Sequence, residues 1–465
     1  MFKPPPSSYG LSRRRFNSSS YGKRRRRLPP LVIVMAILLV LILLEFLARI
    51  LVGVAGKSTE LTAYEGEPAI VNAYNIKFLD PRKQPYDGLS NRGQLAAQRS
   101  IAVGYSLVGN QQSDFWQINE QGFRDDQPVP LAKPKNEFRI FLLGGSTAFG
   151  QWNETNQATI ASKLETRLNQ RVEQQRKSPQ KYRPTVLPFY KPDLVKALAK
   201  PPRLRDGKYR VINAAVPGYT SGNELAQLAL KIMPYRPDAI LVLDGYTDLM
   251  LPSNQSETNI PKIEAFLSSA PGHFWIYLTR KLNDLVTNIT LVKATQKWLL
   301  KPEPSVSQLT LVVTDDTAPL EQHLAAEADE LEKRTTRYRE NHRQVISLTT
   351  GAGIPLVIAL QPEITGCGTK QMSAPEQEIL KKLGSTYKQK IPENYAKLAQ
   401  AVGQLQKWFP KNVKVLNFYK LYEEFPNQAF FDAVHLTEAA NVEISERFYY
   451  TLAALPKLQV PFQQR

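Results

Sequence analysis

Short apolar runs alternate with amphipathic stretches from about residue 138 to residue 455. Five runs have the length and composition of buried strands: 138–143, 209–214, 239–243, 355–360 and 413–418. Amphipathic helical patterns separate them at residues 160–175, 223–233, 395–409 and 437–455. Because parallel strands must be joined by crossover connections, this alternation predicts an α/β fold with a doubly wound, five-stranded parallel sheet.

Two stretches inside this domain are longer than a crossover needs. Residues 176–207 are basic and proline-rich, which favours a surface loop. Residues 250–350 are mostly helical and end in a charged helix at about 320–348. They form either a lid or substrate-facing subdomain, or a helical layer that only packs on the core. Ahead of the domain, residues 57–135 are expected to be a membrane-proximal segment, with short strands around 101–108 and 115–118.

The N-terminal part of the chain is typical of a membrane anchor. Residues 31–44 are apolar and uncharged, and the apolar character continues to residue 54 with interruptions at Glu45 and Arg49. At ~1.5 Å per residue, 31–54 would span roughly 36 Å as a helix, enough to cross a bilayer. Glu45 and Arg49 are spaced to pair on a helix. A cleaved signal peptide is the alternative, but no small-residue cleavage site follows the apolar run.

Charge and cysteine content narrow the possible partners. The formal net charge is +18, and residues 1–27 hold nine basic and no acidic side chains, so 18 − 9 = +9 remains for the rest of the chain. We therefore interpret residues 1–30 as a disordered, basic, cytoplasmic tail and not as a nucleic-acid site. The domain after the helix then faces outward, into the periplasm if the protein is bacterial. Cys367 is the only cysteine, so no intrachain disulfide can form. No zinc-type spacing occurs, and we expect no metal and no cofactor.

Ser146 stands where chemistry is expected in such a fold. It follows the apolar run 138–143 and the pair Gly144–Gly145, at the carboxyl end of a strand and the start of a helix. Ligands of open α/β sheets bind at that edge, and a free backbone N–H there can face a negative charge. Alternatively, Ser146 only caps the following helix.

Asp432 and His435 are spaced so that a carboxylate can orient an imidazole as a base. They follow the run 413–418, which places them at the same sheet edge. The other histidines, His273, His323 and His342, lie in the 250–350 insertion, and the latter two are expected to be solvated. Two further loops reach this edge. Gly218 could offer a backbone N–H and Thr247 a hydroxyl, so that Ser146, Gly218 and Thr247 would form an oxyanion hole.

These segments, taken in order, resemble the SGNH/GDSL hydrolase family. The Gly-Asp-Ser block corresponds to Gly144-Gly145-Ser146 and the second-block glycine to Gly218. The Gly-x-Asn-Asp block corresponds to residues 245–248 and the Asp-x-x-His block to residues 432–435. The resemblance covers about residues 136–455 and implies that residues 136–460 form a three-layer, flavodoxin-like α/β/α domain that cleaves acyl esters without a metal. It implies Ser146 as nucleophile, His435 as base and Asp432 as its orienter.

Two residues depart from the family pattern. Gly145 replaces the aspartate of the first block, and Thr247 replaces the asparagine that donates to the oxyanion. We expect a membrane-anchored serine esterase acting on an acylated small molecule or polysaccharide of the cell envelope. Alternatives are an O-acyltransferase using the same residues, or a catalytically weak glycan-binding or scaffold protein of the same fold. If the shorter threonine donor is misplaced, Asn213 or Asn223 could replace it.

Overall fold

The structure, a computed structural model, describes residues 29–62, 64, 66–86, 93–257, 282, 286–300, 304–311, 318–368, 372–461 and 463–464. Its centre is a five-stranded sheet in which every neighbouring pair is parallel. The strand order is β11 (Val413–Asn417), β10 (Leu356–Leu360), β9 (Ala239–Asp244), β6 (Glu137–Gly144) and β8 (Lys208–Asn213). All five predicted strands are present, and the predicted α/β class is confirmed.

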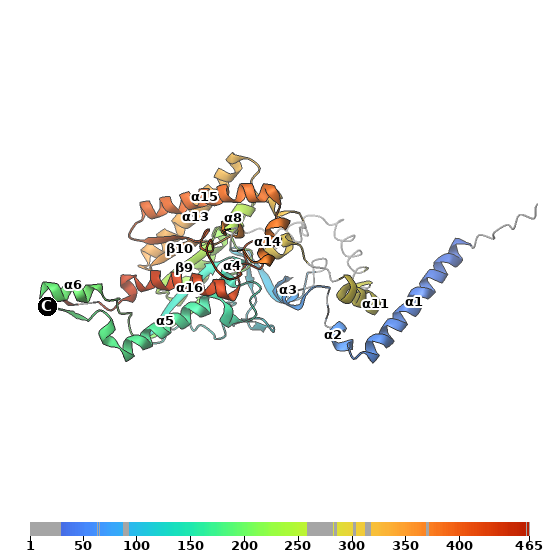
Figure 1. The fold of residues 1–465 in the computed structure, drawn as a ribbon, viewed down its shortest axis with the longest axis horizontal. Helices are drawn as coiled ribbons and strands as arrows, with labels where there is room; N and C mark the ends of the chain where they lie inside the picture. The colour runs from blue at the N-terminus through green and yellow to red at the C-terminus, as the bar shows by residue number, and fades with distance from the viewer. Residues whose placement is uncertain are drawn as a thin grey trace, which may run out of the picture.

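Helices cover both faces of the sheet and make three layers (Figure 1). On one face α5 (Ile160–Lys177) packs against α16 (Glu438–Ala453). On the other face α13 (Ala328–Gly351) packs against α15 (Gly384–Trp408) and α7 (Ser221–Gln227). The buried side of α5 consists of Ile160, Leu164, Leu168 and Val172, the four-residue spacing of a helix face. Helix α15 begins earlier than its sequence pattern predicts, directly after α14 (Ala374–Lys382).

The 176–207 insertion is more ordered than a surface loop, so that prediction is wrong in part. It contains the short strand β7 (Val186–Leu187), which pairs with β12 (Gln463–Gln464), and the helix α6 (Lys191–Ala199). Pro192 lies in the first turn of α6, where a missing N–H costs nothing. The proline that suggests a loop therefore marks the start of a helix.

Residues ahead of the sheet form a second, smaller sheet beside the domain. Its order is β1 (Ile76–Leu79), β2 (Leu95–Ser100) and β3 (Gly104–Leu107), after α3 (Ala69–Tyr74). A two-residue pair, β4 (Gln111–Gln112) and β5 (Gln117–Ile118), follows. The Tyr105 hydroxyl donates to the Pro217 carbonyl, and the Tyr219 hydroxyl donates to the Tyr105 carbonyl. The small sheet thus holds the loop that contains Gly218.

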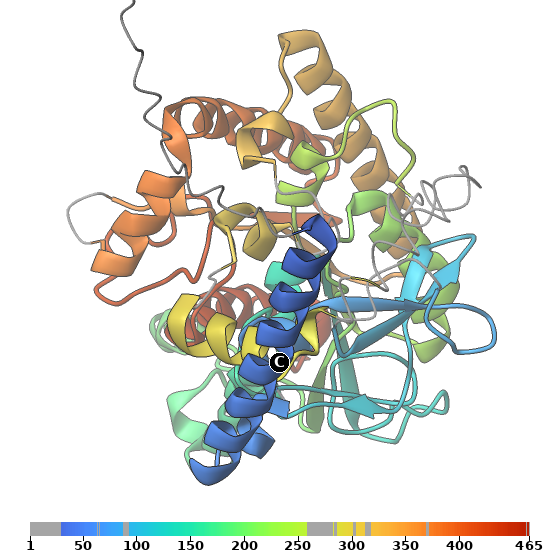
Figure 2. The same ribbon diagram turned by 90° about the vertical axis from the view of Figure 1, so that its right-hand side faces the viewer.

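At the N-terminus, α1 (Pro30–Val54) is long and apolar enough to cross a membrane, with a mean hydropathy of 3.2 over its most apolar window. A short α2 (Ser58–Thr62) follows. From the 250–350 insertion, α11 (Thr290–Ala294), the π-helical turn η5 (Thr295–Leu300) and α12 (Val306–Thr310) are described. Figure 2 shows α11 against α1. His273 lies outside the described residues.

Candidate active site

Ser146 is the first residue of α4 (Ser146–Phe149), a single turn that starts directly after β6. Gly144 has φ +148°, and a Cβ on it would lie 2.2 Å from the Leu243 carbonyl oxygen and 2.6 Å from the Ala148 Cβ. Only glycine therefore lets the chain turn here between β9 and α4. The N-cap position belongs to Gly145, and no side chain caps the helix. The alternative interpretation of Ser146 as an N-cap is wrong.

Asp432 and His435 form the pair that their spacing predicts. The His435 Nδ1 lies 2.6 Å from Asp432 Oδ2, and both side chains are fully buried. Asp432 Oδ1 accepts from the backbone N–H groups of Val434 and His435, both at 3.0 Å. Burial alone would raise the pKa of Asp432, but the His435 ring and these N–H groups hold that pKa below its ordinary value. An ionised carboxylate accepts a hydrogen bond from the His435 Nδ1–H, and in this tautomer Nε2 carries the lone pair.

Trp152 is a third member of this cluster and was not predicted from the sequence. Its Nε1–H donates to Asp432 Oδ2 at 2.8 Å, and its ring meets the His435 ring edge-on. Trp152 has φ +66°, an uncommon backbone conformation for a bulky residue. The next residue, Asn153, donates to the Leu436 carbonyl at 3.0 Å. The loop after α4 is thereby tied to the loop that carries His435.

Ser146 makes no hydrogen bond to His435 in the described chain, but their neighbours in the sequence are in contact. The Thr147 hydroxyl donates to the Val434 carbonyl at 3.2 Å, so the residue after the serine touches the residue before the histidine. Within the described chain, His435 Nε2 is buried and has no hydrogen-bond partner. Serine–histidine hydrogen bonds are often long in free enzymes and tighten when substrate binds. The turn that carries Ser146 and the loop that carries His435 are thus in contact, and the His435 Nε2 has no partner in the described chain.

The three predicted oxyanion donors also surround the Ser146 turn. A Cβ built on Gly145 would lie 3.2 Å from the Tyr219 carbonyl oxygen and 3.4 Å from Thr247 Oγ1, so the Gly218 and Thr247 loops flank this residue. In the part of the chain that the structure describes, neither the N–H groups of Ser146 and Gly218 nor the Thr247 hydroxyl makes a hydrogen bond. Three donors without a hydrogen-bond partner therefore lie in the Ser146 turn and in the two loops beside it. A side chain larger than glycine at position 145 would press on both loops.

Neither asparagine considered as a replacement for Thr247 is free to donate there. Asn213 gives its amide N–H groups to the Ala148 and Phe149 carbonyls at 3.3 and 3.1 Å. Asn223 gives its own to the Val103 and Glu257 carbonyls at 2.9 and 2.7 Å. Both amides hold backbone together, so the hypothesis that either substitutes for Thr247 is wrong.

Arg124 supports the turn from the other side. It is 3% exposed, and its guanidinium donates to the Gly150 carbonyl at 2.7 Å, the Phe149 carbonyl at 3.1 Å and Asn156 Oδ1 at 2.8 Å. The orphan carbonyls at the end of a one-turn helix need such donors. Residues 118–124 thus lie beside the end of α4, and Arg124 holds the last carbonyls of this helix.

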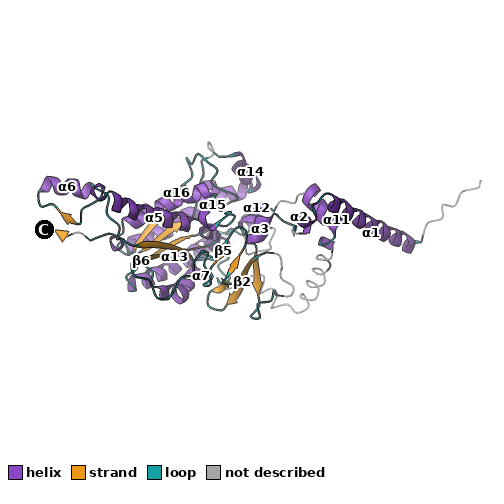
Figure 3. Cartoon of the chain, turned by 90° about the horizontal axis from the view of Figure 1, so that it is seen from below, coloured by secondary structure: helices purple, strands orange, loops and turns teal. Residues whose placement is uncertain are grey.

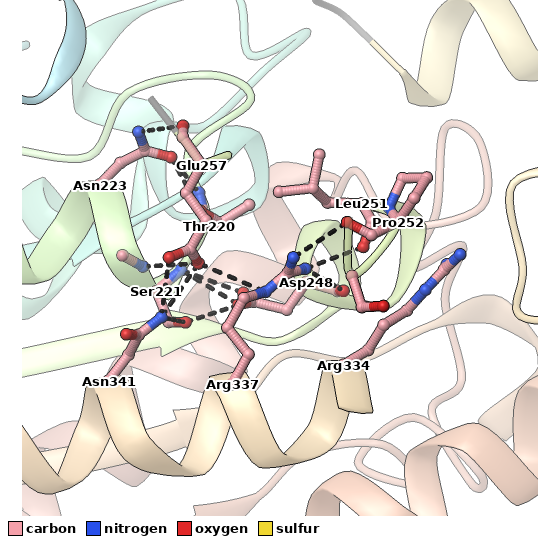
Figure 4. A network of polar contacts seen from close by, with 12 residues as sticks. Thr220, Ser221, Asn223, Asp248, Leu251, Pro252, Glu257, Arg334, Arg337 and Asn341 are labelled. Atoms are coloured by element: carbon pink, nitrogen blue, oxygen red, sulfur yellow. Dashed lines mark hydrogen bonds and ion pairs between the residues drawn. The ribbon is translucent and has the colours of Figure 1, made fainter. Parts of the chain in front are cut away.

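A polar network from α13 holds the two donor loops together (Figure 4). Asp248, next to Thr247 in α8 (Tyr246–Met250), accepts from the Ser221 N–H at 3.1 Å and the Ser221 hydroxyl at 2.5 Å. Asn341 donates to that hydroxyl at 2.9 Å. Arg337 donates to the Leu251 carbonyl at 2.8 Å and the Pro252 carbonyl at 3.0 Å. The last helix of the insertion thus fixes α8 against the loop that follows Gly218.

Several buried acidic side chains and one buried histidine lie next to this network. His342 is 1% exposed and its Nε2 lies 2.9 Å from Asp244 Oδ2, so the expectation that His342 is solvated is wrong. Burial would lower the pKa of His342, but the charge of Asp244 raises it overall. Burial, reinforced by Asp244 and Asp248, raises the pKa of Glu224 well above its ordinary value. Among the described residues no group of three or more acids, histidines or cysteines is arranged to hold a metal ion.

Neither the family models nor the curated proteins give a match to this chain. Solved structures with a similar arrangement include a catalytic mutant of Axe2, an acetylxylan esterase from Geobacillus stearothermophilus, at 11% identity and a TM-score of 0.32, covering 70% of this chain and 97% of that one. TesA matches at 12% identity and a TM-score of 0.31, covering 68% of this chain and 97% of its own. A lipase/acylhydrolase from Enterococcus faecalis matches at 11% identity and a TM-score of 0.32, covering 68% and 95%.

At these identities and TM-scores the matches carry no argument about what the chain does. The matched structures are described as acylhydrolases and esterases, and one is a GDSL-like lipase. The sequence blocks resemble the same group of proteins. The resemblance of the chain to the SGNH/GDSL hydrolases rests on its sequence blocks at residues 144–146, 218, 245–248 and 432–435.

Proposed function

We propose that this protein is a membrane-anchored serine esterase, with Ser146 as nucleophile, His435 as base and Asp432 as the group that orients the base. The observation that carries the proposal is the buried His435 Nε2, which has no hydrogen-bond partner in the described chain. Asp432 holds the His435 ring, and the loop of His435 contacts the Ser146 turn through Thr147 and Val434. An unpartnered buried nitrogen is costly, so the fold maintains it against a free-energy penalty. This free-energy cost is explained if His435 Nε2 must stay free to accept a proton when substrate is bound.

The first half of the reaction forms an acyl-enzyme. His435 Nε2 takes the Ser146 hydroxyl proton while Ser146 Oγ bonds to the ester carbonyl carbon. The carbonyl oxygen becomes an oxyanion, and the N–H groups of Ser146 and Gly218 and the Thr247 hydroxyl donate to it. When the tetrahedral intermediate collapses, the bond to the leaving alcohol breaks. The alcohol oxygen takes the proton from His435.

The second half releases the acyl group. Water gives a proton to His435 as it attacks the Ser146 ester, and the same donors stabilise the second oxyanion. Collapse returns the proton to Ser146 and frees a carboxylic acid. A sugar hydroxyl in place of water would transfer the acyl group instead, so the same residues support an O-acyltransferase. The substrate class that we propose is an O-acylated envelope glycan or small molecule.

The location follows from α1 and the charges before it. An apolar helix of this length after a cluster of arginines is expected to span the membrane with the cluster in the cytoplasm. We place the catalytic domain on the opposite side, in the periplasm if the organism is a bacterium.

The test uses the full chain in detergent with a fluorophosphonate probe and a chromogenic acetate ester. We expect labelling and turnover in the wild type, and loss of both in Ser146→Ala. Ser347→Ala, which changes an exposed serine on α13, is the matched control and should behave as the wild type. Folded wild-type protein that neither labels nor turns over would favour the binding or scaffold role. Faster release of the acyl group on adding oligosaccharide, with the acyl group recovered on the sugar, would identify a transferase.

A further inference from the structure

Residues 286–300 form a second, partly apolar segment, and its helix α11 packs beside α1. Glu45 Oε1 accepts from the Thr290 N–H at 3.0 Å and Glu45 Oε2 from the Leu291 N–H at 2.8 Å, so this carboxylate caps the start of α11. Ala48 and Val52 are the buried residues of α1, one and two turns further on. Figures 1 and 3 both show α11 beside α1.

The positions of the contacts indicate how deep this segment lies. Glu45 precedes the end of α1 at Val54 by nine residues, or ~13 Å along the helix axis. At the other end of the segment, Lys297 Nζ lies 2.8 Å from Glu60 Oε1, and Lys57 Nζ lies 5.3 Å from the Trp298 ring centroid. The segment therefore starts beside the middle of α1 and ends level with the residues that follow α1.

The chemistry of the segment fits a lipid surface. Val286, Leu299 and Leu300 are 50%, 78% and 66% exposed, and Trp298 is 36% exposed. Tryptophan and long lysine side chains are typical of the membrane interface. Trp298, Lys297 and Lys57 are grouped at the end of this segment. The backbone is helical throughout α11 and η5, so its N–H and C=O groups are largely paired within the segment.

The hydrogen bonds of Glu45 explain why an acidic residue occurs in the apolar helix α1. The first N–H groups of a helix have no partner inside it, and in hydrocarbon each such group costs several kcal/mol. The Glu45 carboxylate accepts from two of them, and Arg49 Nε donates to the same carboxylate at 2.7 Å. An ionisable residue at such a depth is tolerated when it is paired in this way.

We propose that residues 286–300 dip into the outer leaflet of the bilayer beside α1, as a second membrane contact capped by Glu45. The inference rests on the proposed membrane anchoring of α1, because the bilayer that α1 crosses must extend to the segment at its side. It goes beyond that anchoring in giving part of the insertion a lipid partner. Two contacts fix the orientation of the domain on the membrane, which a single helix leaves free to rotate.

The experiment measures contact with acyl chains at chosen positions in the full chain. Single cysteines are introduced in a Cys367→Ser background, labelled with bimane and reconstituted into phosphatidylcholine vesicles containing lipids brominated on the acyl chain. Leu299→Cys reports on the segment and Leu51→Cys on α1. Phe189→Cys is the matched apolar control, because Phe189 is 91% exposed and precedes α6 by two residues. Figures 1 and 3 show α6 at the end of the molecule opposite α1.

We expect bromolipid quenching at positions 299 and 51 and none at 189. Quenching at 51 without quenching at 299 would overturn the proposal and leave the anchor standing. No quenching at either position would remove the anchor as well. Protection of position 299 from both bromolipid and aqueous iodide would mean that protein covers it, for instance a second copy, and would also overturn the lipid assignment.

A substitution at Glu45 tests the capping role separately. Glu45→Ala removes both acceptors, and we expect quenching at position 299 to be lost while quenching at position 51 is unchanged. Glu45→Gln keeps one acceptor oxygen and should retain quenching at 299. Equal quenching at 299 in all three proteins would overturn the role assigned to Glu45.

Discussion

At the scale of single residues, the site is defined by polar atoms that have no partner. His435 Nε2, the N–H groups of Ser146 and Gly218, and the Thr247 hydroxyl are unpaired in the described chain, while the amides of Asn213 and Asn223 beside them are fully engaged. Buried polar groups in proteins are nearly always paired. The unpaired atoms at this turn are the donors and the base that the proposed reaction needs, whereas the two asparagine amides hold backbone in place.

Thr247 gives a direct test of the oxyanion hole. Thr247→Val keeps the shape of the side chain and removes its hydroxyl, so we expect kcat to fall by ~10²–10³, the usual effect of losing one such donor. Thr247→Ser keeps the donor and should retain most of the activity. Steady-state kinetics on the chromogenic ester measure both. Equal kcat in the valine and serine variants would show that Thr247 does not donate to the oxyanion.

Trp152 should act through Asp432. Trp152→Phe keeps an aromatic ring beside His435 but removes the Nε1–H that donates to Asp432 Oδ2. A hydrogen bond to a charged group is worth ~1.5–3 kcal/mol. We therefore expect kcat to fall by about tenfold, near the lower end of that range, with little change in KM. Trp408→Phe, at a tryptophan that is 55% exposed, is the control and should leave kcat unchanged. An unchanged kcat in Trp152→Phe would limit this residue to packing.

At the scale of elements, α13 explains part of what the 250–350 insertion contributes. The insertion was expected to be either a lid or a packing layer. Its last helix, α13, packs on the core and also contacts the loops of the candidate site. Arg337 and Asn341 project from α13 into the network around α8, and Tyr338 donates to Asp244 Oδ1 at 2.8 Å at the end of β9. This helix supports the strand ends that present Thr247.

Arg337 is the residue through which this support can be tested. Arg337→Met keeps the aliphatic length but removes the donors to the Leu251 and Pro252 carbonyls, so α8 should shift and Thr247 with it. We expect a lower Tm and a kcat reduced by at least the ~10-fold that one lost charged hydrogen bond represents. Arg343→Met, on the same helix but exposed and paired only with Glu340, should change neither. A loss of Tm without a loss of kcat would separate α13 from the site.

At the scale of the whole molecule, buried acids make stability depend on pH in two opposite directions. Burial, with the charges of Asp244 and Glu257, raises the pKa of Asp248 to about 7, and burial raises the pKa of Glu363 to about 7. A raised acid pKa favours the folded state at low pH, and this contribution is lost as pH rises from the unfolded value toward the folded one. Asp432, with its lowered pKa, contributes stability that is lost only as pH falls below its ordinary value of 3.8.

Asp248→Asn should therefore flatten the stability profile between about pH 4 and pH 7. Between about pH 4 and pH 7 we expect the Tm of the wild type to fall more steeply with rising pH than that of the variant, because only the wild type must ionise Asp248. Thermal unfolding of the full chain at a series of pH values measures this slope. Asp193→Asn, at an exposed position on α6, is the control and should leave the slope unchanged. Identical slopes in wild type and Asp248→Asn would mean that Asp248 does not titrate in this range.

Much of the architecture follows from local sequence. The strands are short apolar runs and the helices carry stripes at helical spacing, features that depend only on neighbouring residues, and all five strands of the main sheet are present. The Asp432–His435 pair depends on a spacing of three residues and forms as predicted. Placement of Ser146, Gly218 and Thr247 at one edge follows from the rule that the carboxyl ends of parallel strands lie together.

Tertiary structure decided the contacts between residues far apart in the chain, for which no local pattern exists. Trp152 meets Asp432 across 280 positions, and Asn341 meets Ser221 across 120. The engagement of Asn213 and Asn223, the burial of His342 among acids and the capping of α11 by Glu45 have the same origin. Sequence determines which side chains reach the sheet edge because strand and helix periodicity is local. Which of their polar atoms remain unpaired depends on packing between elements, and only the folded chain decides it.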